Sequence, residues 1–227
     1  YNRTLWIREG YKMARRVFEH ELQELNDRLK FMGDSISYRI EKVVEALRLG
    51  ETLLMEEIAN SDDEIDRLEH ENEKYCIHLI VEQQPMAGDL RFIAASLKIL
   101  TDMEREADQC EDICNILLKG GYSPGRFEAE EKLISAGECV YSMFTKAMDS
   151  FLLKDPEEAE KVCEMDNIVD NYFKEVVKEL VELINKDPKV AKKAMDLLFV
   201  IKYLERMGDH ATNIAERVPY LVNMWKF

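Results

Sequence analysis

The chain has 227 residues, of which 46% are hydrophobic and 34% are charged, with nine Gly and five Pro. This composition is typical of a protein built from long helices and differs from that of a sheet protein or a disordered chain. The net charge of −15 argues against nucleic acid as a partner and against charge-driven adhesion to anionic lipid. No apolar run is long enough to span a bilayer, so the sequence predicts no direct membrane insertion.

Apolar residues spaced by threes and fours predict three long helices in the first half of the chain. The first helix carries its apolar stripe over residues 22–47 and ends at Gly50. The second is predicted over about 51–83, before a turn around Pro85, and the third over about 89–119.

A cluster of Gly and Pro at residues 120–125 predicts a linker between the two halves of the chain. A fourth helix is predicted to begin at about Phe127. Two Asp-Pro pairs then predict N-caps with Pro at the first helical position, which start a fifth helix near 156–185 and a sixth near 188–222.

Helices of this length, joined by short turns, pack as antiparallel neighbours. The sequence therefore predicts an all-α fold, in which six long antiparallel helices form two tandem three-helix bundles related by an internal repeat. The first bundle is predicted over residues 16–119 and the second over 126–227, with 120–125 as the linker. Residues 1–15 are interpreted as an N-terminal extension or a remnant foreign to the domain.

Each half of the chain carries two acidic pairs at a spacing of four residues, which places both carboxylates of a pair on one helix face. In both halves the second pair has the form Glu-Arg-x-x-Asp. The two pairs lie at similar distances from the turn of an antiparallel hairpin, so four carboxylates are expected to converge in each bundle. These are Asp62, Asp66, Glu104 and Asp108 in the first bundle and Asp166, Asp170, Glu205 and Asp209 in the second.

An ordinary solvated helix face is the alternative for each pair. Because 46 of 227 residues are Asp or Glu, pairs at this spacing also occur by chance, as at Glu41 and Glu45. Two observations favour a site: the ordered recurrence, and the position of Glu104 and Glu205 at the ends of apolar stripes. Partial desolvation of unpaired charge is costly. Either the stripe drifts outward there or a cation sits against it.

The order of three long helices, acidic pair, turn and Glu-Arg-x-x-Asp, present twice, resembles the PhoU family of phosphate-uptake regulators. Residues 84–91 (QPMAGDLR) match that family's characteristic turn, and residues 205–209 (ERMGD) are close to its usual form. The resemblance covers roughly residues 18–222. Ala107 departs from the pattern, because the family commonly has Gly before the Asp.

The resemblance implies a cytoplasmic, non-catalytic regulator, peripheral to the inner membrane, that restrains high-affinity phosphate uptake and phosphate-starvation signalling. It implies a homodimer that binds the phosphate ABC transporter and its associated sensor histidine kinase. The alternatives are a helical adaptor for a different transporter and a metal- or iron-handling protein. A metal-dependent hydrolase is disfavoured, because no general base or activated nucleophile accompanies the acidic pairs.

The resemblance also implies that the eight carboxylates ligate metal ions, with iron, magnesium, manganese, calcium and zinc as the candidates. Hard oxygen donors suit magnesium, calcium, manganese or oxidised iron better than zinc. Arg105 and Arg206 would neutralise excess charge or orient a carboxylate, with an ordinary helical salt bridge as the alternative. Cys110 and Cys114 are interpreted as small core residues, with metal ligation as the alternative. His210 is expected on the surface or in packing.

Overall fold

The computed structural model describes the backbone of residues 2–60 and 62–222 and the side chains of residues 15–60 and 64–222. Six helices of 22 residues or more dominate this part of the chain, which contains no strand. They are α1 (Asn2–Leu49), α3 (Asp62–Gln83), α4 (Ala87–Gly120), α5 (Ala129–Leu153), α6 (Pro156–Lys186) and α7 (Ala191–Glu216). The predicted all-α fold with six long helices is confirmed.

The single helix predicted over 51–83 is wrong, because two helices occupy this stretch. The first is α2 (Thr52–Ala59), and α3 begins at Asp62. Asn60 follows α2, and its side-chain amide donates to the carbonyl of Glu56 at 2.6 Å. Short polar side chains compete in this way for backbone hydrogen bonds and favour a helix end.

The sixth helix, predicted over 188–222, is also divided. It opens with a 3-10 turn, η1 (Pro188–Val190), continues as α7, and ends in the short α8 (Val218–Val222). The break falls two residues before Pro219, which has no backbone N–H to continue the helical ladder.

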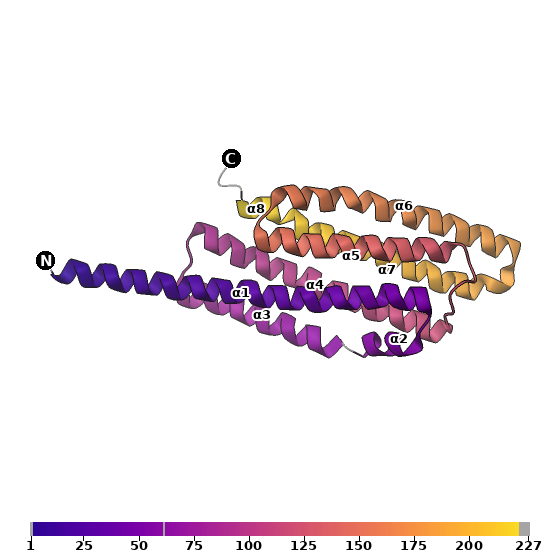
Figure 1. Cartoon of the computed structure of the whole chain (residues 1–227), viewed down its shortest axis with the longest axis horizontal. Helices are drawn as coiled ribbons and strands as arrows, with labels where there is room; N and C mark the ends of the chain where they lie inside the picture. The colour runs from indigo at the N-terminus through magenta and orange to yellow at the C-terminus, as the bar shows by residue number, and fades with distance from the viewer. Residues whose placement is uncertain (1, 61, 223–227) are drawn as a thin grey trace.

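Each half of the chain forms a bundle of long antiparallel helices (Figure 1). In the first bundle α1, α3 and α4 pack on one another, and α2 packs against α1 and α4. In the second bundle α5, α6 and α7 pack on one another. Between the bundles, α4 is capped by Gly121, which has a left-handed backbone (φ 58°) and whose N–H bonds the carbonyls of Leu117 and Leu118.

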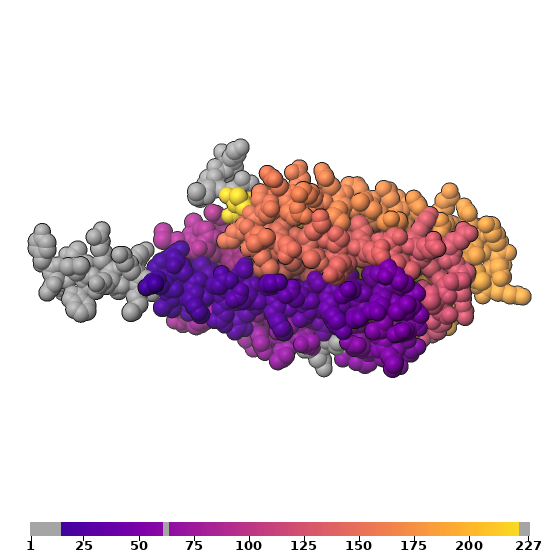
Figure 2. All heavy atoms as spheres, viewed as in Figure 1, coloured from indigo at the N-terminus to yellow at the C-terminus, as the bar shows by residue number. Residues whose placement is uncertain are grey.

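The two bundles meet along two helix pairs, α1 with α5 and α4 with α7. The α1–α5 contact is close and is apolar where the two backbones approach, with an exposed ion pair between Arg48 and Glu138. A Cβ placed on Gly137 would lie 2.8 Å from Cγ2 of Val44, and one on Gly33 would lie 3.0 Å from Cε of Met148. Glycine therefore lets the two backbones approach. Figure 2 shows the surface of α1 meeting the second bundle along a continuous boundary.

Apolar burial joins the two bundles into one core. Large side chains from both halves are fully buried, among them Ile36 and Ile40 of α1 and Phe144 and Phe151 of α5. Full burial of such a side chain contributes about 1.5–3 kcal/mol. None of the helices in the described residues has the length and apolarity needed to cross a bilayer.

The predicted N-cap at Asp155 is present and provides a test of local stability. Its carboxylate accepts hydrogen bonds from the backbone N–H of Glu157 at 3.0 Å and of Glu158 at 3.2 Å. We expect Asp155→Ala to lower the free energy of unfolding by about 1 kcal/mol, measured by urea denaturation. Asp155→Asn keeps an acceptor and should change little. Equal stability of the Ala variant and the unaltered chain would show that the cap contributes nothing.

Candidate metal centre

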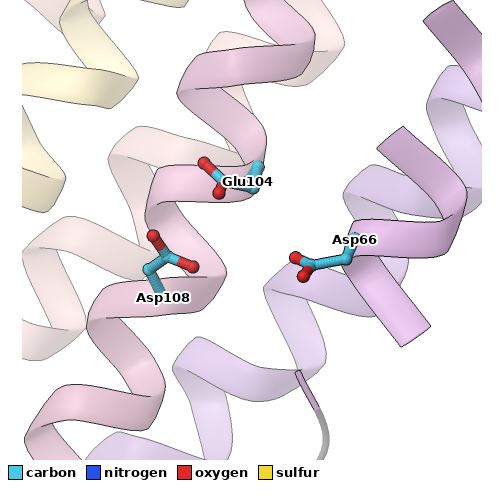
Figure 3. A group of neighbouring side chains, drawn as sticks. All are labelled: Asp66, Glu104 and Asp108. Atoms are coloured by element: carbon cyan, nitrogen blue, oxygen red, sulfur yellow. The ribbon is translucent and has the colours of Figure 1, made fainter. Parts of the chain in front are cut away.

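Three predicted carboxylates meet in the first bundle. Asp66 projects from α3 towards Glu104 and Asp108 of α4, which lie one turn apart (Figure 3). One carboxylate oxygen from each residue lies within 4.8 Å of the others. Asp66 is exposed, whereas Glu104 and Asp108 are partly buried. The side chain of Asp62, the fourth predicted member, lies outside the described residues.

The α3–α4 hairpin explains this convergence. The two helices are joined by residues 84–86, where Gln84 adopts a left-handed backbone with φ 44°. The apolar stripe of α4 is buried at Ile93 and Leu100 and emerges into partial exposure at Glu104. Glu104 and Asp108 therefore stand at the edge of the core, facing the neighbouring helix.

Burial and neighbouring charges change the pKa of a carboxyl in the first group. Burial, followed by the charge of Asp108, raises the pKa of Glu104 above its ordinary value, and Arg105 partly opposes this shift. Arg105 bonds Asp108 at 3.0 Å and lies 3.4 Å from the Glu104 carboxylate. Arg105 therefore forms an ion pair within α4, and this contact is compatible with both charge neutralisation and an ordinary helical salt bridge.

Glu69 belongs to the same acidic group and was missed in the sequence. It lies three residues after Asp66 on α3 and is partly buried. Burial, then Glu73 and Asp66, raise the pKa of Glu69, and Glu69 in turn raises that of Glu104. The spacing of three from Asp66 was the available signal, because residues three apart share a helix face.

The four predicted carboxylates of the second bundle also act on one another. Burial, then Asp209, Asp170 and Glu205, raise the pKa of Asp166. Burial and then Glu205 raise the pKa of Asp209. The hairpin of α6 and α7 therefore brings the four carboxylates near enough to influence one another electrostatically.

The second group is looser than the first. Within the described side chains, only the first group places three carboxylate oxygens within 4.8 Å of one another. In the second group two lysines form ion pairs with the carboxylates: Lys174 bonds Asp170 at 3.3 Å, and Lys202 pairs with Glu205. The repeat in the sequence is thus accompanied by different ion pairing in the two bundles.

Gly208 permits close packing in the second group. A Cβ at Gly208 would lie 3.3 Å from Oδ1 of Asp166, tighter than an ordinary contact. The corresponding residue of the first bundle is Ala107, which is 3% exposed. A glycine before the Asp thus leaves room for a carboxylate from the opposite helix.

The donor set of the first group fits a hard cation. All three donors are carboxylate oxygens, which suit magnesium, calcium, manganese or iron. Zinc sites use mainly Cys and His, and neither contributes to this group. An ion bridging α3 and α4 would offset the burial and the repulsion by Asp108 that together raise the pKa of Glu104.

The two cysteines near the first group are core residues in the structure. Cys110 and Cys114 are both fully buried. Burial raises the pKa of Cys114 to about 12 and that of Cys110 well above its ordinary value. A thiol must ionise to ligate a metal well, so these environments favour packing.

The chain is a tandem helical-bundle protein, in which each copy carries an acidic group on the hairpin formed by its last two long helices. The model of the PhoU domain matches residues 29–117 and 133–218, which is more than half of the chain. The chain belongs to the PhoU family.

Relatives match almost the whole chain. It is 35% identical over 211 residues to a phosphate-specific transport system accessory protein PhoU homolog of Clostridium acetobutylicum, covering 92% of this chain and 96% of that protein. The crystal structure of PhoU from Pseudomonas aeruginosa superimposes with a TM-score of 0.85 at 30% identity, over 90% of this chain and 98% of that one. That of the phosphate transport system regulatory protein PhoU from Streptococcus pneumoniae gives 0.83 at 27% identity, over 90% and 96%.

The repulsion in the first group leads to a prediction for the metal-free protein. Glu104→Gln removes one of three crowded charges and keeps the side-chain volume. We expect it to raise the free energy of unfolding by a few tenths to about 1 kcal/mol at pH 8 with a chelator present, measured by urea denaturation. The matched control is Glu41→Gln on the exposed face of α1, which should change nothing. A loss of stability in Glu104→Gln would mean that Arg105 already compensates the charge.

Proposed function

We propose that this chain is a regulatory accessory protein of a phosphate transport system, which restrains high-affinity uptake and phosphate-starvation signalling when phosphate is plentiful. The match along nearly the full length of the Clostridium acetobutylicum accessory protein carries this proposal. The likeness in fold to the Streptococcus pneumoniae regulatory protein supports it. Both bundles are matched in each case, so the support extends to the whole tandem repeat.

The proposed mode of action is binding and not catalysis. The chain would act in the cytoplasm, as a homodimer, on the phosphate ABC transporter and on the sensor histidine kinase that accompanies it. It would be peripheral to the inner membrane through these partners. The acidic groups support a binding role, because they consist of carboxylates and basic side chains that pair with them.

Metal ions are the second part of the proposal. The metal ligands of the first bundle would be Asp62, Asp66, Glu104 and Asp108, with Glu69 beside them. Those of the second bundle would be Asp166, Asp170, Glu205 and Asp209. A bound cation would supply positive charge that joins the two helices of each hairpin. The compact oxygen-donor set of the first group supports tighter binding there than in the second group, where Lys174 and Lys202 compete for the carboxylates.

Deletion of the gene in its native host tests the regulatory role. With abundant phosphate, we expect the deletion strain to take up phosphate without restraint and to express phosphate-starvation genes. Uptake of labelled phosphate and a starvation-promoter reporter measure the two effects, and the gene restored in trans should reverse both. Normal uptake and repression in a strain without a second family member would assign the adaptor to another transporter.

The metal assignment has its own test. We expect Glu104→Ala combined with Asp108→Ala to lower the bound metal by the share of the first bundle, because both side chains belong to one group. Metal content after dialysis against a chosen ion, measured by mass spectrometry, gives the stoichiometry. The matched control is Glu41→Ala with Glu45→Ala, an acidic pair of the same spacing on α1. An unchanged stoichiometry in the first variant would reject the assignment.

A further inference from the structure

The two contacts between the bundles differ in chemistry. The α1–α5 contact is apolar and close-packed at Gly33 and Gly137, and an exposed ion pair joins Arg48 to Glu138. The α4–α7 contact contains a row of polar side chains, and we call this row the seam. It consists of Asp102, Glu106, Gln109 and Asp112 of α4 and Tyr203, His210 and Asn213 of α7.

Both ends of the seam carry polar contacts between the bundles. At one end Asp102 bonds Nδ1 of His210 at 3.0 Å and accepts from the amide of Asn213 at 3.1 Å. At the other end, burial and a hydrogen bond from its hydroxyl to Asp112 raise the pKa of Tyr203. Low numbers on α4 thus meet high numbers on α7, so the two helices cross antiparallel.

The middle of the seam is polar but unsatisfied. Glu106 is fully buried, and neither of its carboxylate oxygens has a hydrogen-bond partner. Gln109 is 2% exposed, and neither atom of its side-chain amide has one. Both residues lie between Asp102 and Asp112 along α4. A buried polar group without a partner disfavours the state that buries it by about ten- to a hundredfold in the equilibrium constant.

Glu106 does not face the candidate metal group. Each residue turns about 100° around a helix, so Glu104 and Asp108 lie about 200° from Glu106 on either side. Burial, followed by the charge of Asp102 one turn earlier in the seam, raises the pKa of Glu106. The carboxylate of Glu106 therefore points towards the junction between the bundles.

The internal repeat shows that helix packing at this position does not require an acid. Because Glu104 aligns with Glu205, Glu106 aligns with Met207, which is fully buried in the second bundle. An apolar side chain thus fills the equivalent place in the same fold. The acid at this position gives up stability that methionine would provide.

We propose that the two bundles part along the seam while the α1–α5 contact stays packed as the hinge. Because Glu106 and Gln109 have no hydrogen-bond partners, they destabilise the closed arrangement. The seam therefore opens while both bundles stay folded. Opening exposes the polar face of α4 to water or to a partner. It leaves each candidate metal group intact, because each group lies within one bundle. This inference goes beyond the proposed function and does not depend on metal binding.

One native thiol, that of Cys110, reports seam opening, and the thiol of Cys76 serves as the internal reference. Cys110 lies one turn after Glu106 and is influenced electrostatically by it, whereas Cys76 lies on α3 inside the first bundle. Both thiols are 0% exposed and free. Under native conditions with a chelator, we expect iodoacetamide to label Cys110 at least about tenfold faster than Cys76, as resolved by peptide mass spectrometry.

Glu106→Met then tests the cause of the opening. This variant should slow labelling of Cys110 by about ten- to a hundredfold and leave Cys76 unchanged, since it removes the unsatisfied carboxylate. Glu182→Met, an exposed position on α6, is the matched control and should leave both rates unchanged. Equal labelling of Cys110 and Cys76 in the unaltered chain overturns the proposal, even without the variant. So does a Glu106→Met variant that leaves Cys110 unaffected or slows both thiols equally.

Discussion

The antiparallel pairing of α3 with α4, and of α6 with α7, is the constraint on which the rest of the structure depends. Each hairpin fixes the position along its two helices at which the acidic pairs lie opposite each other. The apolar stripes that hold the hairpins together reach the edge of the core at these positions, so the carboxylates are partly desolvated and close to one another. The raised pKa values of Glu104 and Asp166 are the electrostatic consequence.

The two copies of the repeat resolve this crowding differently. In the first bundle Arg105 bridges Glu104 and Asp108, and Glu69 adds a further charge to the group. In the second bundle Lys174 and Lys202 engage one carboxylate each. One acidic pattern in the sequence thus corresponds to two sites of different charge balance, and we expect the two sites to differ in affinity for a cation.

The two helix pairs that join the bundles differ in the polar side chains that they bury. Close packing at Val44 and Gly137 holds α1 against α5, whereas the polar contacts between α4 and α7 lie at the two ends of the seam. The helices of the seam are also the helices that carry Glu104 and Glu205. Because each acidic group spans a hairpin within one bundle, movement at the seam shifts the two groups as units without dismantling either.

The sequence by itself determined the local features of this protein. Six long helices, the N-cap at Asp155, the linker and the acidic pairs follow from periodicity, capping chemistry and spacing, which act over a few residues. The family resemblance also rested on such short patterns. The break after α2 and the division of the sixth helix were the local features that the sequence analysis missed.

Only the tertiary structure decided which side chains meet. It brought Glu69 into the first group and paired Lys202 with Glu205 in the second group. It also joined His210 to Asp102 and buried Glu106 without a hydrogen-bond partner. Helical spacing predicts that Glu106 and Glu104 face opposite sides of α4, but it does not say which side is covered. That depends on the neighbouring helices and their crossing, which are set by contacts between residues about a hundred positions apart in the chain.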